Sequence, residues 1–297
     1  MKTFQIQPVG PYSLEESAQF IGGWVRPSEN GSSAAGHLHL AFLTDADWKP
    51  VGVCLTQDAA GTVHGEVFGA AEVEAVRHQV ARTLSLDVDG RAWPALAERD
   101  PVVAVLQRMF PGFRPVNWSD AYEAAAWCIV SSRINMRQAQ GVKDRLCREL
   151  GHELSIHGHA MWTFPAPERL ARLESFPGLF GRKVEYLTGL ARAALAGTLD
   201  TDSLRALPAD QSLAALRRLA GIGEFGSQLV RLRALSAVDE LPTAEPRMEA
   251  AVRSAYGLQT ELRDVAGDWS PYTMWVCVCL RRAAGGAAGM VHSRASG

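Results

Sequence analysis

The spacing of apolar residues changes about one third of the way along the chain. Up to residue 98, segments in which apolar and polar residues alternate predict four strands, over 3–9, 37–43, 51–57 and 62–68. Helical spacing appears twice among them, in a run that opens at Ser13 and in a second over 71–84. Ser13 and Glu16 have the spacing of a capping box, which satisfies two free amides of a first helical turn. Residues 1–98 are therefore predicted to form an α+β domain with a small antiparallel sheet.

Beyond residue 98 only the helical period remains. Apolar-periodic segments recur up to residue 282, separated by residues that stop helices, such as Pro111, Gly112, Gly151, Gly197 and Gly257. This pattern predicts an all-helical (all-α) domain over 99–284. Residues 285–297 are rich in Gly, Ala and Ser, and are predicted to be a disordered tail.

Composition and charge limit the kinds of protein that this chain can be. It has 297 residues, of which 47% are hydrophobic and 21% charged, so it is a globular chain long enough for two domains. The 30 Lys and Arg residues nearly balance the 32 Asp and Glu residues, so any nucleic-acid partner must be bound by a local site. Because there is no apolar leader and no apolar run of membrane-spanning length, a cytoplasmic location is expected.

The cysteines and histidines lack the spacing of a disulfide framework or a metal site. The cysteines are scattered and odd in number, which predicts buried free thiols at Cys54, Cys128, Cys147, Cys277 and Cys279. His157 and His159 flank a glycine in a loop, without the partnered Cys or Asp residues that a zinc site needs. We therefore expect no bound metal.

A glycine-rich turn stands between two helical segments of the second domain. Gly221 and Gly223 flank an apolar Ile222, and a second helix begins near Gly226 and Ser227. Glycines permit positive φ, and they expose the backbone amides at the N-terminus of the next helix, where the helix dipole is positive. Such a turn suits a phosphate oxygen. It is equally typical of an ordinary corner between two helices in which glycine permits close packing.

An acidic motif follows this turn after one more helical segment. Asp239, Pro242 and Glu245 are spaced as D-x-x-P-x-x-E, directly before another helix. With the glycine turn, this motif makes the sequence resemble the helix-hairpin-helix DNA glycosylase superfamily, most closely its DNA-3-methyladenine glycosylase II branch. Further matches to that branch follow in the same order along the chain, over 99–101, 110–115, 121–130, 164–170, 181–187 and 269–272. The resemblance implies a helix-hairpin-helix glycosylase domain over 99–284, preceded by the additional α+β domain of that branch.

The resemblance also implies an activity. It is that of a monofunctional base excision repair enzyme, which flips an alkylated purine such as 3-methyladenine out of duplex DNA and hydrolyses its N-glycosidic bond. Glu245 occupies the position of the superfamily's catalytic Asp, where a carboxylate stabilises positive charge on the deoxyribose. Because Glu is one methylene longer, the alternative is that Glu245 is only an acidic residue at a helix N-terminus. Asp239 is expected to support the loop, and Glu240 and Glu249 to be solvated.

Other positions carried over from the superfamily concern contacts with DNA. Arg133, after Ser132, matches the residue that relatives insert into the base stack; the alternatives are a phosphate contact and a surface charge. Phe225 stands where relatives with lyase activity have a nucleophilic Lys, so no Schiff-base chemistry is expected. Phe225 and Tyr272 are candidates for the base pocket, with core packing as the alternative. Arg281 falls where the branch has an aromatic residue.

The partner implied by the resemblance is double-stranded DNA that contains a damaged base or an abasic site, bound by a monomer without a membrane or a cofactor. The backbone of 221–227 would grip a phosphate, and members of the superfamily often hold a monovalent cation at this hairpin. Two alternatives stay open. One is a member that binds damaged DNA without cutting it, which the Glu at position 245 favours. The other is a glycosylase for deaminated or oxidised bases.

Overall fold

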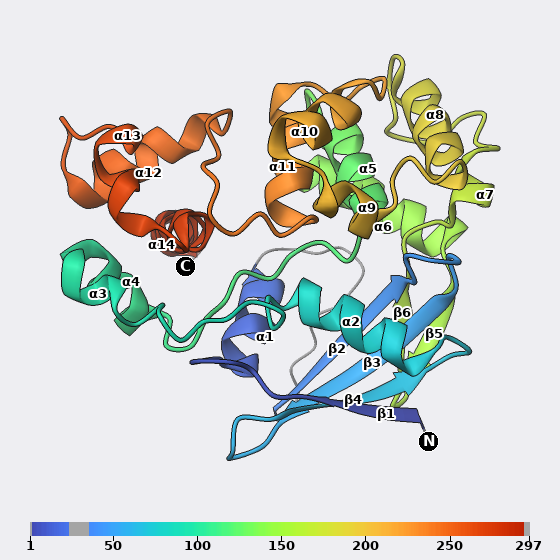
Figure 1. Cartoon of the computed structure of the whole chain (residues 1–297). Helices are drawn as coiled ribbons and strands as arrows, with labels where there is room; N and C mark the ends of the chain where they lie inside the picture. The colour runs from blue at the N-terminus through green and yellow to red at the C-terminus, as the bar shows by residue number, and fades with distance from the viewer. Residues whose placement is uncertain (1, 24–35, 294–297) are drawn as a thin grey trace.

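The computed structural model of the protein describes residues 2–23 and 36–293. Its N-terminal part is built on an antiparallel sheet with strand order β1-β4-β3-β2, which confirms the predicted sheet (Figure 1). The strands are β1 (Lys2–Ile6), β2 (His37–Leu43), β3 (Pro50–Gln57) and β4 (Val63–Phe68). Alternate residues of β2 and β3, among them Leu38, Leu40 and Val53, share a core with helices α1 (Leu14–Gly23) and α2 (Val73–Thr83). These two helices therefore cover one face of the sheet.

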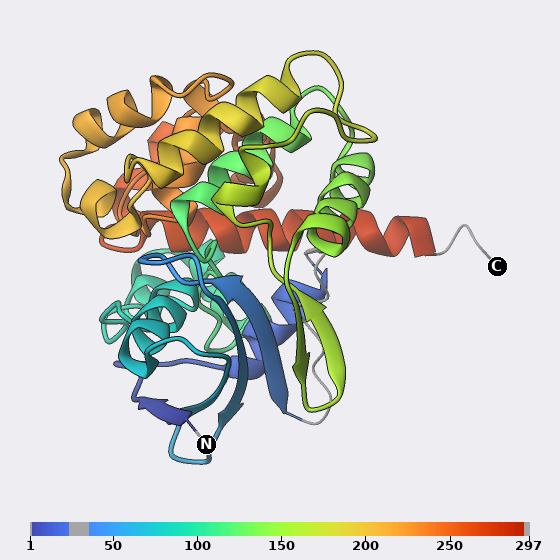
Figure 2. The same ribbon diagram turned by 90° about the vertical axis from the view of Figure 1, so that its right-hand side faces the viewer.

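A β-hairpin from a distant part of the chain covers the opposite face. β5 (Glu153–Ile156) and β6 (His159–Trp162) pair with each other and lie against β3 and β2 (Figure 2). Ile156 and Met161 of the hairpin pack there with Ala41 and Cys54 of the sheet. The hairpin corrects the prediction that residues 99–284 are all helical. Four residues in each strand are too few to give a clear alternation in the sequence.

The remaining regular elements of the described chain are helices. They are α3 (Leu96–Arg99), α4 (Pro101–Met109), α5 (Ala121–Ser131), α6 (Met136–Leu150), α7 (Pro167–Leu170), α8 (Lys183–Leu195), α9 (Thr201–Ala206), α10 (Ala209–Arg217), α11 (Glu224–Arg233), α12 (Pro246–Tyr256), α13 (Leu262–Val265), the 3-10 helix η1 (Ala266–Trp269) and α14 (Thr273–Ser293). The backbone of α14 is helical to Ser293, whereas the sequence predicts a disordered tail from residue 285.

The buried apolar residues form two large cores, and the boundary between these cores does not fall at residue 98 of the chain. The first core joins the sheet, α1 and α2 to α4, α12 and α14, and contains the fully buried Trp269 and Trp275. The second core lies among α5, α6, α8, α10 and α11, between Trp118 and Leu235 along the chain. Residues 118–235 therefore form a helical unit that is inserted into the unit built on the sheet.

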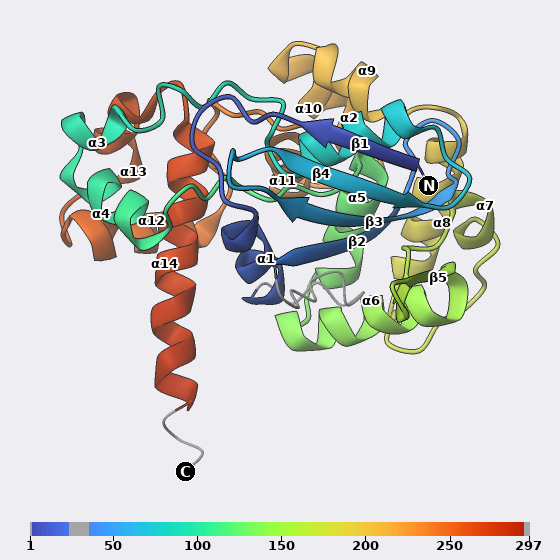
Figure 3. The same cartoon turned by 90° about the horizontal axis from the view of Figure 1, so that it is seen from below.

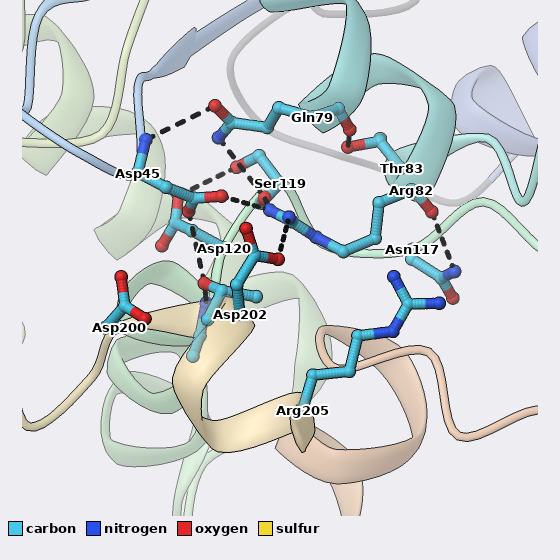
Figure 4. A network of polar contacts seen from close by, with 12 residues as sticks. Asp45, Gln79, Arg82, Thr83, Asn117, Ser119, Asp120, Asp200, Asp202 and Arg205 are labelled. Atoms are coloured by element: carbon cyan, nitrogen blue, oxygen red, sulfur yellow. Dashed lines mark hydrogen bonds and ion pairs between the residues drawn. The ribbon is translucent and has the colours of Figure 1, made fainter. Parts of the chain in front are cut away.

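A buried arginine connects the two units. Arg82 on α2 is fully buried, and its guanidinium forms ion pairs with Asp45, which follows β2, and with Asp202 of α9, the latter at 3.2 Å (Figure 4). The same guanidinium donates a hydrogen bond to the carbonyl oxygen of Ser119, 2.8 Å away just before α5. Because loss of one partner would leave a buried charge uncompensated, this network fixes the two units relative to each other.

Two general expectations can be compared with the structure. None of the helices in the described part of the chain has the length and apolar character needed to span a bilayer. All five cysteines are free and buried, as predicted. Burial raises the pKa of both Cys128 and Cys147 to about 12, so these two thiols stay protonated at neutral pH.

Candidate active-site cleft

The predicted glycine turn connects α10 to α11, and one of its positions requires glycine. Gly221 has φ +89°, in the left-handed region, and a Cβ atom built on it would lie 2.7 Å from the ring of Tyr186. Ile222 beside it is buried, and its amide donates to the carbonyl oxygen of Leu219 at 3.0 Å. The turn is therefore anchored from within by Ile222, and only glycine fits its tightest point.

The N-terminus of α11 presents free backbone amides. Gly223 is its N-cap residue, is exposed, and has no atom within 4 Å of a Cβ built on it. Within the described residues, the amides of Gly223, Glu224 and Phe225 donate to no backbone carbonyl. Exposed amides at the positive end of a helix dipole form a ready anion site. The geometry is that of a phosphate-binding turn.

Two residues predicted to contact DNA lie inside the second core instead. Gly226 is buried against α5, where a Cβ built on it would stand 3.4 Å from Cβ of Cys128. Ser227 is fully buried, and its hydroxyl donates to the carbonyl oxygen of Glu224 at 2.9 Å. Both residues therefore pack α11 against α5, and the anion site is limited to the amides that precede them.

Arg133 lies in the loop between α5 and α6. The helix before it ends at Ser131, and the next one is capped by Asn135, whose side chain accepts a hydrogen bond from the amide of Gln138. Arg133 is exposed and has φ +56°, a conformation that turns the chain sharply. Ser132 is also exposed. Because α5 packs against α11, this loop and the glycine turn belong to the same rigid unit.

A cleft of about 880 Å³ is lined by residues of α11, α12 and α14, with further residues from α1 and the end of α4. Figure 3 shows these helices gathered around the N-terminal half of α14. Most of the lining is apolar, and includes Phe225, Leu229, Met248 and Met274. Glu245 is the only carboxylate among the described residues that line it. An apolar cleft with a few polar groups is the usual form of a site for a small organic group.

Glu245 is the N-cap residue of α12 and is half-buried at the cleft. Its carboxylate accepts a hydrogen bond from the amide of Arg247 at 3.2 Å, so the first turn of its own helix orients it. The guanidinium of Arg281 on α14 shares the cleft with this carboxylate. Burial lowers the pKa of Arg281, and the negative charge of Glu245 opposes that shift. The cleft therefore contains the Glu245 carboxylate and an arginine, Arg281, on which the charge of this carboxylate acts.

The loop that carries Glu245 is fastened to α11. The side-chain amide of Gln228 donates to the hydroxyl of Thr243 at 2.7 Å, and its oxygen accepts from the amide of Ala244 at 2.8 Å. One turn further along α11, Arg231 forms a two-pronged ion pair with Glu240, with contacts of 2.5–3.0 Å. The helix whose N-terminus presents the free amides thus also positions the carboxylate.

The other acids near this loop have structural partners. Asp239 accepts hydrogen bonds from the hydroxyls of Ser270 and Thr273 at 2.7 and 2.6 Å, which connects the loop to the start of α14. Burial raises the pKa of Asp239, but these hydrogen bonds outweigh burial and leave the pKa below its usual value. Glu249, predicted to be solvated, accepts from the amide of Leu262 at 3.2 Å. Asp239 therefore holds the loop in place, and Glu249 is bonded to the start of α13.

Curated relatives of known name match part of the chain, although no family model matches it. The chain is 29% identical over 165 residues to a DNA-3-methyladenine glycosylase of Bacillus subtilis (strain 168), and 24% identical over 171 residues to a putative DNA-3-methyladenine glycosylase of that strain. Each match covers 54% of this chain, and 53% and 58% of the two relatives. The chain thus matches little more than half the length of these relatives.

Solved structures share the fold, two of those described here over almost all of the chain. A 3-methyladenine DNA glycosylase from Archaeoglobus fulgidus has a TM-score of 0.76 at 20% identity, covering 93% of this chain and 96% of that one. The 8-oxoguanine glycosylase/lyase of Clostridium acetobutylicum has a TM-score of 0.65 at 16% identity, covering 94% and 95%. The Schizosaccharomyces pombe 3-methyladenine DNA glycosylase, solved with abasic DNA, has a TM-score of 0.51 at 18% identity, covering 64% and 94%. The chain is thus similar in sequence to DNA-3-methyladenine glycosylases over about half of its length, and it shares the fold of these solved DNA glycosylases.

One of the two predicted pocket aromatics lies outside the cleft. Tyr272 is 3% exposed, and its hydroxyl donates to the carbonyl oxygen of Asp89 at 2.6 Å. Its ring packs against Trp93 and Trp275 in the first core, with ring centres 5.7 and 4.8 Å apart. Phe225 is 42% exposed and lines the cleft. The prediction that Tyr272 contributes to the base pocket is therefore wrong.

The cleft also contains residues that the sequence alone did not assign to a site. Gln228 follows Phe225 by one helical turn on the same face of α11, and Met248 follows Glu245 in the same way on α12. That spacing is the signal by which both residues can be found. Side chains that commonly bind metals do not gather here, since Cys277 is the only cysteine and no histidine occurs among the described lining residues.

Proposed function

We propose that the chain is a DNA glycosylase of base excision repair, which releases alkylated purines of the 3-methyladenine kind from duplex DNA. The observation that carries the proposal is the position of Glu245, the single carboxylate among the described residues that line a mostly apolar cleft. This residue is oriented by α12 and fastened through α11 to the free amides of the glycine turn. The substrate class is supported by relatives and structural neighbours that are called 3-methyladenine glycosylases.

The reaction follows from these few groups. The amides of 223–225 hold a phosphate of the damaged strand, and Arg133 fills the gap in the base stack when the nucleotide flips out. The flipped base enters the cleft beside Phe225. The bond between the base nitrogen and C1′ of the sugar breaks, its electron pair leaves with the base, and positive charge develops on the sugar. The Glu245 carboxylate stabilises this charge, and the oxygen of a water molecule then bonds to C1′ and releases a proton to the solvent.

The lining of the cleft supports hydrolysis without strand cleavage. A lyase of the Schiff-base type needs an amine nucleophile beside the sugar. No lysine lines the cleft in the described part of the chain. Phe225, at the start of α11, stands at the position where the sequence resemblance implies a nucleophilic lysine in relatives with lyase activity. Lys183, a buried lysine of the same helical unit, donates its ammonium to the carbonyl oxygen of Val130 at 2.8 Å. The proposed enzyme is therefore monofunctional.

The first experiment compares Glu245→Gln with the wild-type protein on alkylated duplex DNA. The glutamine keeps an oxygen that accepts from the amide of Arg247, so the helix cap is preserved while the charge is lost. We expect the rate of base release to fall by about 100-fold or more, because loss of one preorganised electrostatic group typically has this effect. Binding of a duplex that contains an abasic-site analogue should change little. Equal release rates would remove Glu245 from the mechanism.

Glu249→Gln is the matched control, because Glu249 is a carboxylate on the same helix that bonds to Leu262 outside the cleft. It should release bases at the wild-type rate. A loss of activity in both variants would mean that the charge of α12, rather than the position of Glu245, matters.

A second candidate function is the binding of damaged DNA without base release. It is favoured by Arg281, whose positive charge acts on the same cleft as the charge of Glu245. A carboxylate with another positive charge nearby stabilises a developing positive charge less strongly. For this function, the wild-type protein must bind the abasic duplex tightly and release no base at excess enzyme over hours.

A further inference from the structure

A cluster of metal-binding side chains lies on the sheet, among residues that do not line the cleft. His37 and His39 alternate along β2 and so project from the same face, and Cys54 of β3 stands directly opposite His39 in the strand register. One ligand atom of each residue lies within 4.8 Å of the other two. The Nδ1 atom of His37 is 3.4 Å from the Sγ atom of Cys54. Two nitrogens and a sulfur are therefore already gathered at one point.

The β5–β6 hairpin places two more histidines above this cluster. His157 and His159 belong to its tight turn, and their rings lie 5.8 and 5.6 Å from the ring of His39, measured between centres. The turn holds His157 at φ +48° and Gly158 at φ +83°, both in the left-handed region that two-residue hairpin turns require. His157 is already engaged by Glu66, with Nε2 and Oε2 3.1 Å apart.

His39 has no hydrogen-bond partner that would explain its position. Its side chain is 5% exposed, and neither ring nitrogen has a hydrogen-bond partner in the described structure. A buried polar group without a partner is costly to the folded state. Because neither ring nitrogen is engaged, one of them can carry the proton while the other keeps a free lone pair. A neutral imidazole with a free lone pair is a metal ligand.

We propose that His37, His39 and Cys54 bind a zinc ion, with His159 of the hairpin as the fourth ligand. Zinc prefers such a tetrahedral set of nitrogen and sulfur ligands, whereas magnesium and calcium prefer oxygen. Zinc–ligand bonds of about 2.0–2.3 Å place tetrahedral ligand atoms roughly 3.5 Å apart, so the cluster closes with side-chain movements of about 1 Å. On binding, the thiol of Cys54 releases its proton to the solvent and coordinates as the thiolate.

The ion would serve as a structural connection. The sheet that supplies His37, His39 and Cys54 belongs to the first unit, and the hairpin that supplies His159 belongs to the inserted helical unit. Zinc would therefore join the two units at a second place, beside the Arg82 network. Because none of its ligands lines the cleft, the site does not depend on the proposed enzymatic function.

The test uses the full chain without a histidine tag, stripped of metal by a chelator and then titrated with zinc sulfate. We expect one zinc ion per chain in competition with a chromophoric chelator, and a higher midpoint of thermal unfolding because zinc binds only the folded state. Magnesium at the same concentration should not raise the midpoint. Cobalt should give a near-ultraviolet charge-transfer band, which is the signature of a Cys54 thiolate ligand.

Two ligand variants and one control make the result specific. His37 is exposed, so His37→Ala keeps the fold while weakening zinc binding by at least about 10-fold, and Cys54→Ser should abolish the cobalt charge-transfer band. His78→Ala is the control, because His78 is an exposed histidine of α2 outside the cluster. Failure of the folded wild-type chain to bind zinc, or zinc binding by His37→Ala and Cys54→Ser equal to that of the wild type, would overturn the proposal.

Discussion

An added methyl group should affect different properties of the protein at two glycines of the same turn. Gly221→Ala places a Cβ 2.7 Å from the ring of Tyr186, at a residue with φ +89°. Gly223→Ala places a Cβ in open space, at a residue with φ −94° that any amino acid can adopt. We expect Gly221→Ala to lower stability and Gly223→Ala to lower DNA affinity.

The structure gives the size of each effect. An L-residue in the left-handed region costs about 1–2 kcal/mol, and the steric overlap with the Tyr186 ring adds about 1–3 kcal/mol, so Gly221→Ala should lose about 2–5 kcal/mol of folding free energy. At about 2–4 °C per kcal/mol, the midpoint of thermal unfolding falls by roughly 4–20 °C. Gly223→Ala changes only an N-cap preference, worth about 1 kcal/mol or less. Its methyl group obstructs charge-assisted hydrogen bonds of about 1.5–3 kcal/mol, which is about 10- to 100-fold in affinity.

Stability is measured by thermal unfolding, and DNA affinity by fluorescence anisotropy on a duplex that contains an abasic-site analogue. All affinities are measured at one salt concentration and at a temperature below the lowest unfolding midpoint of the variants. Tyr186→Ala in the background of Gly221→Ala should restore the folding free energy that is lost to the steric contact. The loss that comes from the positive φ of residue 221 should remain. Wild-type DNA affinity in Gly223→Ala would show that the amides of α11 do not hold a phosphate, and the reasoning about the turn would be refuted.

Two further predictions concern the start of α5 and the loop at its end. Burial, with the charges of Glu123 and Asp45, raises the pKa of Asp120 to about 8, well above the usual value of an aspartate. The folded state therefore holds a proton that the unfolded chain loses, so stability falls between about pH 4 and pH 8, by at most about 1.4 kcal/mol per pH unit. Asp120→Asn should flatten this slope in urea titrations; an unchanged slope would contradict the assignment. Arg133→Ala should weaken binding to an abasic duplex more than to an intact one, and equal losses would make Arg133 a simple phosphate contact.

The sequence predicts those parts of the fold in which periodicity is long enough to be seen. The four strands of the sheet and the helices of more than eight residues follow from their apolar spacing. The hairpin strands and the helices α9 and α13 are four to six residues long, so no period develops in them. The division into two cores depends on α14 and the sheet contributing to the same core, although they are far apart in the chain.

In the candidate site, too, local features can be predicted from the sequence, whereas features that depend on long-range packing cannot. The glycine turn and Glu245 can be found from the sequence because each is a local motif whose geometry is set within a few residues. Tyr272 was misplaced because an aromatic residue before a helix does not reveal whether its ring faces a cleft or the core. The histidine cluster could not be found, because His39 and His159 are brought together only by the packing of the hairpin on the sheet.

Glu245 is one methylene longer than the aspartate that the sequence resemblance implies at this position. An N-cap aspartate normally accepts from an amide of the first helical turn through its short side chain. Glu245 makes the same kind of bond to the amide of Arg247, so this bond orients its longer side chain at the N-terminus of α12. The loop before it is held by Gln228 from α11, so α11 positions the backbone of Glu245 relative to the glycine turn.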